Sequence, residues 1–241
     1  MTPLDRHGRA ALQFSGGKDS LALVYLLRPH WDRLTLYHVD TGDLLPEVRE
    51  IVGMVEAMVP SFSRIDTNSA AWMERAGLPS DLVPTSSSWV GLEIGASKQP
   101  IVDRFTCCVA NLMAPLHQRM IADNVTLAIR GTKRADMARL PVESGDTSLG
   151  YELWLPLQEW SHDEVFDYLR HAGAPICRVY EHKVNAPECA TCPAWWSEGR
   201  AAYLATHHPD LFATYRAKLG AVTAEIVPHW RALMTETGDL K

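Results

Sequence analysis

The stretch Phe14-Ser15-Gly16-Gly17-Lys18-Asp19-Ser20 decides how this sequence should fold. It follows a short apolar run, residues 10–14, and precedes residues 21–26, whose apolar side chains recur with helical spacing. A glycine-rich turn between a buried strand and a helix can bind phosphate, because the first N–H groups of the helix are unpaired and carry its positive dipole end. Gly16 and Gly17 permit backbone conformations and a close approach that other residues forbid.

Downstream residues repeat the strand–helix order. Residues 34–39 resemble a strand, Pro46 opens a helical pattern that reaches residue 58, and residues 61–65 resemble a third strand. This order predicts a parallel sheet with helices on its faces. From 66 to 98 the signal is weak and indicates a long irregular excursion. Further elements are expected as a helix over 108–122, strands over 125–129 and 153–157, a helix from Ser161 to near Gly173, and a mostly helical tail over 195–233.

The predicted fold class is therefore α/β, a Rossmann-like parallel sheet flanked by helices with a helical C-terminal extension. An α/β domain is expected over residues 1–175, and a cysteine-containing segment with helices over 176–241. Of the 241 residues, 46% are hydrophobic and 22% charged, which excludes a disordered chain. No apolar run is long enough to span a membrane and the start lacks the apolar core of a signal peptide, so a cytoplasmic protein is expected.

The net charge of the chain indicates whether it can bind nucleic acid directly. Lys and Arg number 23 and Asp and Glu 29, a net charge of −6. A protein that holds nucleic acid by its phosphates usually has the opposite balance. A nucleic-acid acceptor is therefore expected only through partner subunits or a local patch.

The segment FSGGKDS resembles the PP-loop of the ATP pyrophosphatase superfamily, whose members have the adenine nucleotide alpha hydrolase-like fold. The resemblance implies that ATP is cleaved between its α and β phosphates. It also implies that Ser15, Gly16, Gly17 and Ser20 hold pyrophosphate, and that Lys18 and Asp19 complete the loop.

Two further segments resemble the PAPS (phosphoadenosine phosphosulfate) reductase branch of that superfamily. Asp40-Thr41-Gly42 with Pro46-Glu47 is similar to its DTG…PE segment, which lies near the nucleotide. Residues 131–136 with Arg139 are similar to its GxRxxDxxxR segment, which implies that Gly131 and Arg139 line the site and that Lys133 and Arg134 face phosphates. Taken alone, the first segment could cap a helix and the second could be solvated surface. Both follow predicted strands, where parallel sheets bind ligands.

Four of the five cysteines form a ligand pattern. Cys189 and Cys192 have the two-residue gap that lets two thiolates reach one metal, and Cys107-Cys108 supplies two more. Four sulfurs suit iron–sulfur or zinc. The pair followed six residues later by Pro115-Leu116 resembles the iron–sulfur APS (adenosine 5'-phosphosulfate) reductases, which implies a [4Fe–4S] cluster. Structural zinc, or buried apolar roles for the adjacent pair, remain alternatives. Cys177 is expected to be a core residue, with a sulfur-carrying thiol as the alternative.

One feature of the APS and PAPS reductases is absent from this sequence. APS and PAPS reductases act through a cysteine in a C-terminal Glu-Cys-Gly segment, and no cysteine follows Cys192 here. The reductases also depart from SGGKDS in their loop. Both observations favour ATP itself as substrate, with Lys18, Ser20, Lys133 and Arg134 as catalytic residues and Mg²⁺ on the phosphates.

The expected function is then an ATP pyrophosphatase that adenylates an acceptor oxygen for sulfur incorporation, similar to the DndC-type proteins of DNA phosphorothioation. A cysteine desulfurase is the expected sulfur donor. The alternatives are an APS or PAPS reductase, a non-catalytic ATP-binding subunit, and a tRNA-thiolation enzyme. The sequence leaves the acceptor and the oligomeric state open.

Overall fold

The structure is a computed structural model that describes residues 2–182, 189–196 and 199–239. Its contacts divide the chain into two compact units. The first, here the sheet unit, comprises Met1–Asp40, Leu44–Thr67 and Ala114–Glu188. The second, here the cysteine unit, comprises Thr41–Asp43, Asn68–Met113 and Cys189–Lys241. The boundary expected near residue 175 stays a prediction.

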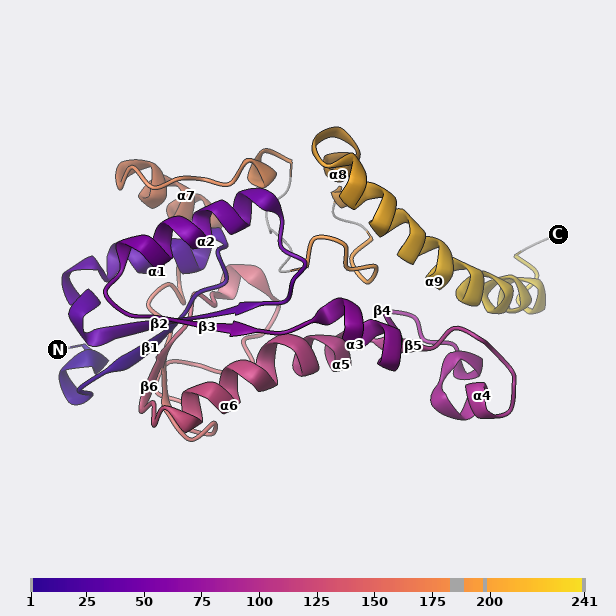
Figure 1. The fold of residues 1–241 in the computed structure, drawn as a ribbon, viewed down its shortest axis with the longest axis horizontal. Coiled ribbons are helices and arrows are strands. Elements are labelled where there is room, and N and C mark those ends of the chain that lie inside the picture. Colours follow the sequence, from indigo (N-terminus) through magenta and orange to yellow (C-terminus); the bar gives the residue numbers. More distant parts are fainter. Residues whose placement is uncertain (1, 183–188, 197–198, 240–241) are drawn as a thin grey trace. The chain divides into compact units, whose positions relative to one another are not determined.

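The sheet unit is built on five parallel strands in the order β3-β2-β1-β6-β7. Figure 1 labels β1, β2, β3 and β6. The strands are β1 (Ala10–Gln13), β2 (Leu34–Asp40), β3 (Phe62–Asp66), β6 (Leu127–Ile129) and β7 (Glu152–Trp154). In β1, Ala11 pairs with Thr35 on one side and with Ala128 on the other. A central strand has neighbours on both edges and helices on both faces, which explains its continuous apolar run.

Helices cover both faces of this sheet (Figure 1). The α-helices of the unit are α1 (Lys18–Leu26), α2 (Pro46–Met58), α6 (Ala114–Ala122) and α7 (His162–His171). The shorter turns of 3₁₀-helix are η1 (Pro3–Arg6), η2 (Arg28–Arg33), η5 (Arg134–Asp136) and η6 (Arg178–Glu181). The predicted capping box is present, because Ser161 and Glu164 bond each other's backbone N–H groups at the start of α7. The predicted α/β class, the parallel sheet and the helical C-terminal region are confirmed.

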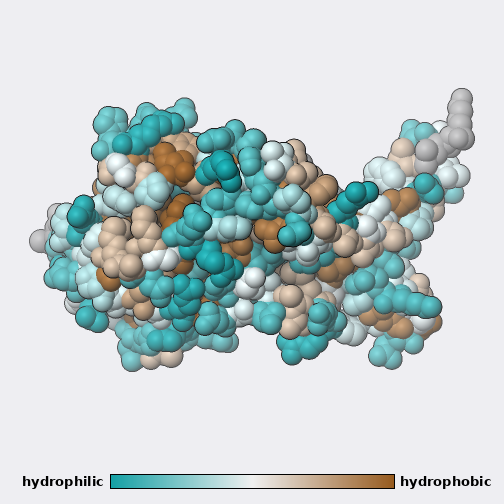
Figure 2. Space-filling model, turned by 45° about the horizontal axis from the view of Figure 1, so that its top comes forward, coloured by the Kyte–Doolittle hydropathy of each residue, from teal (hydrophilic) through white to brown (hydrophobic). Residues whose placement is uncertain are grey.

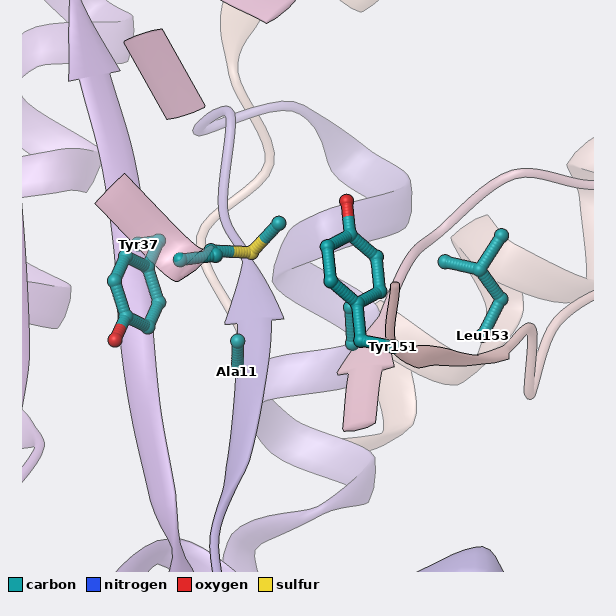
Figure 3. Close-up of a cluster of buried hydrophobic side chains, with 6 residues drawn as sticks. Ala11, Tyr37, Tyr151 and Leu153 are labelled. Atoms are coloured by element: carbon teal, nitrogen blue, oxygen red, sulfur yellow. The ribbon is translucent and has the colours of Figure 1, made fainter. Parts of the chain in front are cut away.

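One group of buried side chains joins the strands of this sheet to α6 (Figure 3). Met120 of α6 is fully buried beside Tyr37 of β2 and Leu153 of β7. The Tyr37 hydroxyl donates a hydrogen bond of 2.9 Å to the Asp123 carboxylate, so its polar end is satisfied although its ring is buried. Cys177 is also buried, as predicted.

The cysteine unit contains a two-stranded parallel sheet, β4 (Leu78–Ser80) with β5 (Ile101–Asp103), and several helices. The helices are α3 (Ser69–Ala76), η3 (Thr85–Ser87), α4 (Trp89–Glu93), α5 (Arg104–Cys108), the π-helical turn η4 (Val109–Met113), α8 (Arg200–His207) and α9 (Pro209–Glu236). The expectation of an irregular excursion over 66–98 was wrong where α3, β4 and α4 lie. These elements are three to eight residues long, too short to establish a hydrophobic period.

Within the described residues, no helix is long and apolar enough to cross a membrane. Exposed large apolar side chains do occur, among them Trp89, Val90 and Ile94 of the α4 region. On the face drawn in Figure 2, hydrophobic residues form separate small areas between hydrophilic ones. Small apolar areas such as those on the drawn face are normal on a protein surface.

Candidate functional site: a phosphate loop and a set of cysteines

The loop between β1 and α1 is organised by its own two serines. The backbone N–H of Ser15 donates to Ser20 Oγ at 3.2 Å, and Ser20 Oγ donates to the carbonyl of Gly17 at 3.0 Å. The N–H of Gly17 donates to Ser15 Oγ at 3.3 Å. Because these hydroxyls fix the turn, the first N–H groups of α1 face the loop in a defined arrangement.

Gly16 is required by geometry. Its φ is +82°, a left-handed conformation, and a Cβ there would lie 2.8 Å from Val48 Cγ1 and 3.0 Å from Val52 Cγ2 of α2. Gly131 is the second close approach, since a Cβ on it would lie 3.0 Å from the Asp19 carbonyl carbon. The segment after β6 therefore packs directly on the start of α1, and the two predicted phosphate segments meet in the sheet unit.

Behind the loop, four charged side chains alternate in sign. Lys18 Nζ donates to Asp19 Oδ2 at 2.8 Å, and Lys133 Nζ lies 2.9 Å from Asp19 Oδ1. Lys133 also donates to Asp136. Burial lowers the pKa of Lys18, and Asp19 opposes that shift. Lys133 is fully buried. Its charge is therefore matched by two carboxylates, and its expected place facing phosphates stays a prediction.

Tyr180 covers the first N–H of α1. Its hydroxyl accepts the backbone N–H of Lys18 at 2.8 Å, which is the kind of donor that an anion would use. The Tyr180 ring packs edge-on against Phe166, with centroids 5.5 Å apart, and the Lys18 ammonium lies 5.7 Å from the Tyr180 ring centroid. The sequence gives no local signal for this residue, because it lies 162 positions from Lys18.

Three other residues expected to contact the nucleotide, Arg134, Arg139 and Asp40, differ in their exposure and in their charged partners. Arg134 is exposed and pairs with Glu143 and Glu159, at 2.8 Å and 2.9 Å. Arg139 is exposed as well and lines an open cavity of about 610 Å³ together with Arg134. The Asp40 carboxylate at the end of β2 is buried and lies 3.2 Å from Arg49 and 3.3 Å from Arg64. The roles assigned to these residues stay predictions.

The cysteine unit contains all four predicted ligands. Cys107 and Cys192 are buried, while Cys108 and Cys189 are partly exposed. Burial, with smaller contributions from the nearby Cys192 and Cys108, raises the pKa of Cys107 to about 12. Thr41 Oγ1 lies 3.5 Å from Cys189 Sγ, so the segment that continues from Asp40 reaches the CxxC pair. Gly42, the residue after Thr41, has a φ of +79°, a left-handed conformation that favours glycine.

Polar contacts hold the CxxC turn. Asp43 Oδ2 accepts the N–H and the hydroxyl of Thr191, at 3.1 Å and 2.8 Å, and Lys218 Nζ donates to the same hydroxyl at 2.7 Å. Arg200 Nη1 donates to the carbonyl of Cys192 at 2.8 Å. Among the described residues, no three His, Cys, Asp or Glu side chains are grouped closely enough to hold a metal ion. The four cysteines therefore stay a predicted ligand set.

Comparison with known families gives a match to the phosphoadenosine phosphosulfate reductase domain over residues 9–195. The chain belongs to the PAPS reductase family. The match includes the loop, the segments after β2 and β6, and the four cysteines of the ligand pattern.

A curated relative is the adenosine 5'-phosphosulfate reductase of Allochromatium vinosum (strain ATCC 17899 / DSM 180 / NBRC 103801 / NCIMB 10441 / D). It is 24% identical over 177 residues, which are 73% of this chain and 64% of that protein. This chain thus spans less than two thirds of its relative. A similar solved structure is the PAPS reductase of Candida auris in a phosphate complex, with a TM-score of 0.52 and 14% identity over 74% of this chain and 80% of that one. That likeness supports the fold alone.

Proposed function

We propose that this member of the PAPS reductase family binds an adenine nucleotide by its phosphates at residues 15–20 and acts on a sulfonucleotide, APS or PAPS, as a reductase. The two electrons come from a dithiol reductant. One thiol attacks the sulfur and displaces AMP or adenosine 3',5'-bisphosphate, and the second thiol then releases sulfite as the disulfide forms. The observation that carries the proposal is the junction of the loop with the segment after β6, where a Cβ on Gly131 would lie 3.0 Å from the Asp19 backbone. The family match and the APS reductase relative favour the sulfonucleotide as substrate. The family match and this relative support a sulfonucleotide substrate better than the ATP substrate that the loop alone suggests.

In this proposal the loop binds and orients the phosphate. The N–H groups of Gly17 and Lys18 donate to phosphate oxygens, with the positive end of α1 behind them. Lys18 and Lys133 contribute positive charge that Asp19 holds in place. Tyr180 must move its hydroxyl from the Lys18 N–H, or share that donor, when a phosphate arrives. Arg134 and Arg139 line the open cavity that follows β6 and would extend the anion-binding site.

We further propose a [4Fe–4S] cluster on Cys107, Cys108, Cys189 and Cys192, with zinc as the alternative. The donor chemistry fits, because thiolates are the usual ligands of both. Arg200 and Lys218 beside the CxxC turn fit as well, since four thiolates around either centre leave a negative charge to balance. Bound there, the cluster would supply an anionic iron–sulfur centre to the unit that carries Thr41.

A second candidate function is ATP cleavage to AMP and pyrophosphate, which activates an acceptor oxygen for sulfur transfer. One observation favours it: the loop is a complete SGGKDS, with Lys18 buried against Asp19. Mg²⁺ on the phosphates, a cysteine desulfurase as sulfur donor and a nucleic-acid acceptor delivered by partner subunits belong to this candidate. DNA phosphorothioation and tRNA thiolation are its two reaction classes.

A single anaerobic experiment separates the candidates. Iron-reconstituted protein is incubated with a dithiol reductant and sulfur-labelled APS or PAPS, and in parallel with Mg²⁺ and α-labelled ATP. Sulfite release supports the reductase, whereas AMP with pyrophosphate from ATP supports the second candidate. Ser20→Ala should abolish whichever activity is found, and Tyr37→Phe, which removes only a hydroxyl bonded to Asp123, should retain it. If neither nucleotide reacts yet one binds, the chain is a binding subunit and both proposals are wrong.

A further inference from the structure

Arg200 is a buried cation at the turn that carries Cys189 and Cys192. It is the first residue of α8, and only 2% of its surface is exposed. Nη1 donates to the carbonyl of Cys192 at 2.8 Å and lies 3.4 Å from that of Cys189. Its guanidinium carbon lies 5.7 Å from the ring centroid of buried Tyr215. Arg200 is therefore fixed from two directions, by the CxxC backbone and by α9.

Within the part of the chain that the structure describes, the remaining donors of this guanidinium have no hydrogen-bond partner. Nε and Nη2 are buried and make no hydrogen bond to any described residue, and no described carboxylate pairs with Arg200. Burying a charge in this state costs several kcal/mol unless an anion compensates it. Lys218, the other cation at the turn, differs, because it is held by Thr191 and lies 4.0 Å from Asp43.

The cysteine side chains at this turn can become negatively charged when they bind a metal as thiolates. Arg200 and Lys218 both donate to groups of the turn that carries Cys189 and Cys192. A tetrathiolate centre holding Zn²⁺, or a [4Fe–4S]²⁺ core, has a net charge of about −2. Such a centre would supply the acceptor atoms and the counter-charge that the buried guanidinium lacks.

We infer that Arg200 is a positioning residue for a cysteine-held anionic metal centre. It holds the CxxC carbonyls through Nη1 and directs Nε and Nη2 at the thiolate or sulfide sulfurs. Because this role depends on the cysteine centre proposed above, its test has to separate the two. The positive charge should strengthen metal binding, and it should make a cluster easier to reduce, since reduction adds a negative charge beside it.

The experiment compares wild-type protein with Arg200→Met and Arg200→Lys. Arg216→Met is the matched control, because Arg216 is an exposed arginine on α9, next to Tyr215. Metal-free protein is titrated with Co²⁺, which reports thiolate ligation by its absorption, and iron and sulfide are counted after anaerobic reconstitution. Circular dichroism establishes that each variant is folded.

Arg200→Met should bind Co²⁺ about tenfold more weakly or worse, whereas Arg200→Lys and Arg216→Met should stay near wild type. In reconstituted protein, the ratio of reduced to oxidised cluster in Arg200→Met at a fixed potential should fall about tenfold, which is 59 mV for a one-electron couple. Folded Arg200→Met that matches wild type in both readouts overturns the role of Arg200 and leaves the cysteine centre standing. Wild-type protein that binds neither Co²⁺ nor iron overturns the centre, and the role of Arg200 with it. If Arg200→Met does not fold, Arg200→Gln, which removes the charge and keeps a polar side chain, decides: equal metal affinity and potential in wild type and Arg200→Gln again overturns the role.

Discussion

Replacing Lys133 by methionine removes the central positive charge of the group behind the phosphate loop. The Lys133 side chain is fully buried, and its ammonium lies 2.9 Å from Asp19 Oδ1 and donates to Asp136. Deleting one partner of a buried ion pair costs about 3–5 kcal/mol, because the remaining charge is left uncompensated. Here the two carboxylate side chains are 22% and 19% exposed, and Asp19 keeps Lys18 as a partner. The lower end, about 3 kcal/mol, therefore applies.

For a chain of this size, 1 kcal/mol shifts the melting temperature by about 2–4 °C, so Lys133→Met should melt about 6–12 °C below wild type. Urea unfolding followed by circular dichroism gives the same quantity as a free energy. The matched control is Arg134→Met next to it, whose partners Glu143 and Glu159 are 61% and 69% exposed. Surface pairs of this kind contribute little, and this variant should melt within about 2 °C of wild type.

The same pair of variants tests how Lys133 serves the loop. If Lys133 acts by holding Asp19, folded Lys133→Met at low temperature should retain part of its nucleotide affinity, and a direct phosphate contact should cost much more. A Lys133→Met melting temperature no lower than that of Arg134→Met would refute the buried ion-pair reasoning.

Three other changes test separate features of the sheet unit. Gly16→Ala should destabilise the fold by about 1–3 kcal/mol and abolish nucleotide binding, since it adds strain at φ +82° and a Cβ 2.8 Å from Val48; unchanged urea unfolding would contradict this. Tyr180→Phe removes the hydroxyl that accepts the Lys18 N–H and should tighten pyrophosphate binding several-fold by calorimetry. Weaker binding would mean that the hydroxyl itself holds the phosphate. Burial and the Asp123 hydrogen bond raise the pKa of Tyr37 to about 12, above its ordinary value near 10. Tyr37 therefore contributes stability that is present below pH 10 and lost as pH rises towards 12. Tyr37→Phe should unfold in urea with a shallower loss between those pH values, and equal slopes would refute the shift.

The fold could be predicted because its decisive signals are local. Residues 10–14, 34–39 and 61–65 are short apolar runs separated by helical patterns, and the structure has β1, β2 and β3 there. The loop could be predicted for the same reason, since its glycines, serines and lysine are consecutive. Elements of three to eight residues over 66–98 have no comparable period, and they were missed.

The partners within the site could not be predicted, because they come from distant positions and have no pattern of their own. Tyr180 meets Lys18 across 162 residues, and Asp43 meets Thr191 across 148. Arg200 lies in a tail whose sequence indicates only helix. Sequence spacing shows which residue types suit a phosphate or a metal, but tertiary packing decides which charge faces which.

The two sets of polar groups follow one physical rule. At the loop, Lys133 is buried with two carboxylates, so its charge is balanced within the protein. At the CxxC turn, Arg200 is buried with carbonyl contacts and no described carboxylate. A balanced buried charge supports the fold, whereas an unbalanced one is costly unless a ligand completes it. Under the two proposals above, that difference would make Lys133 a residue that holds the loop in shape and Arg200 a residue that faces a bound group.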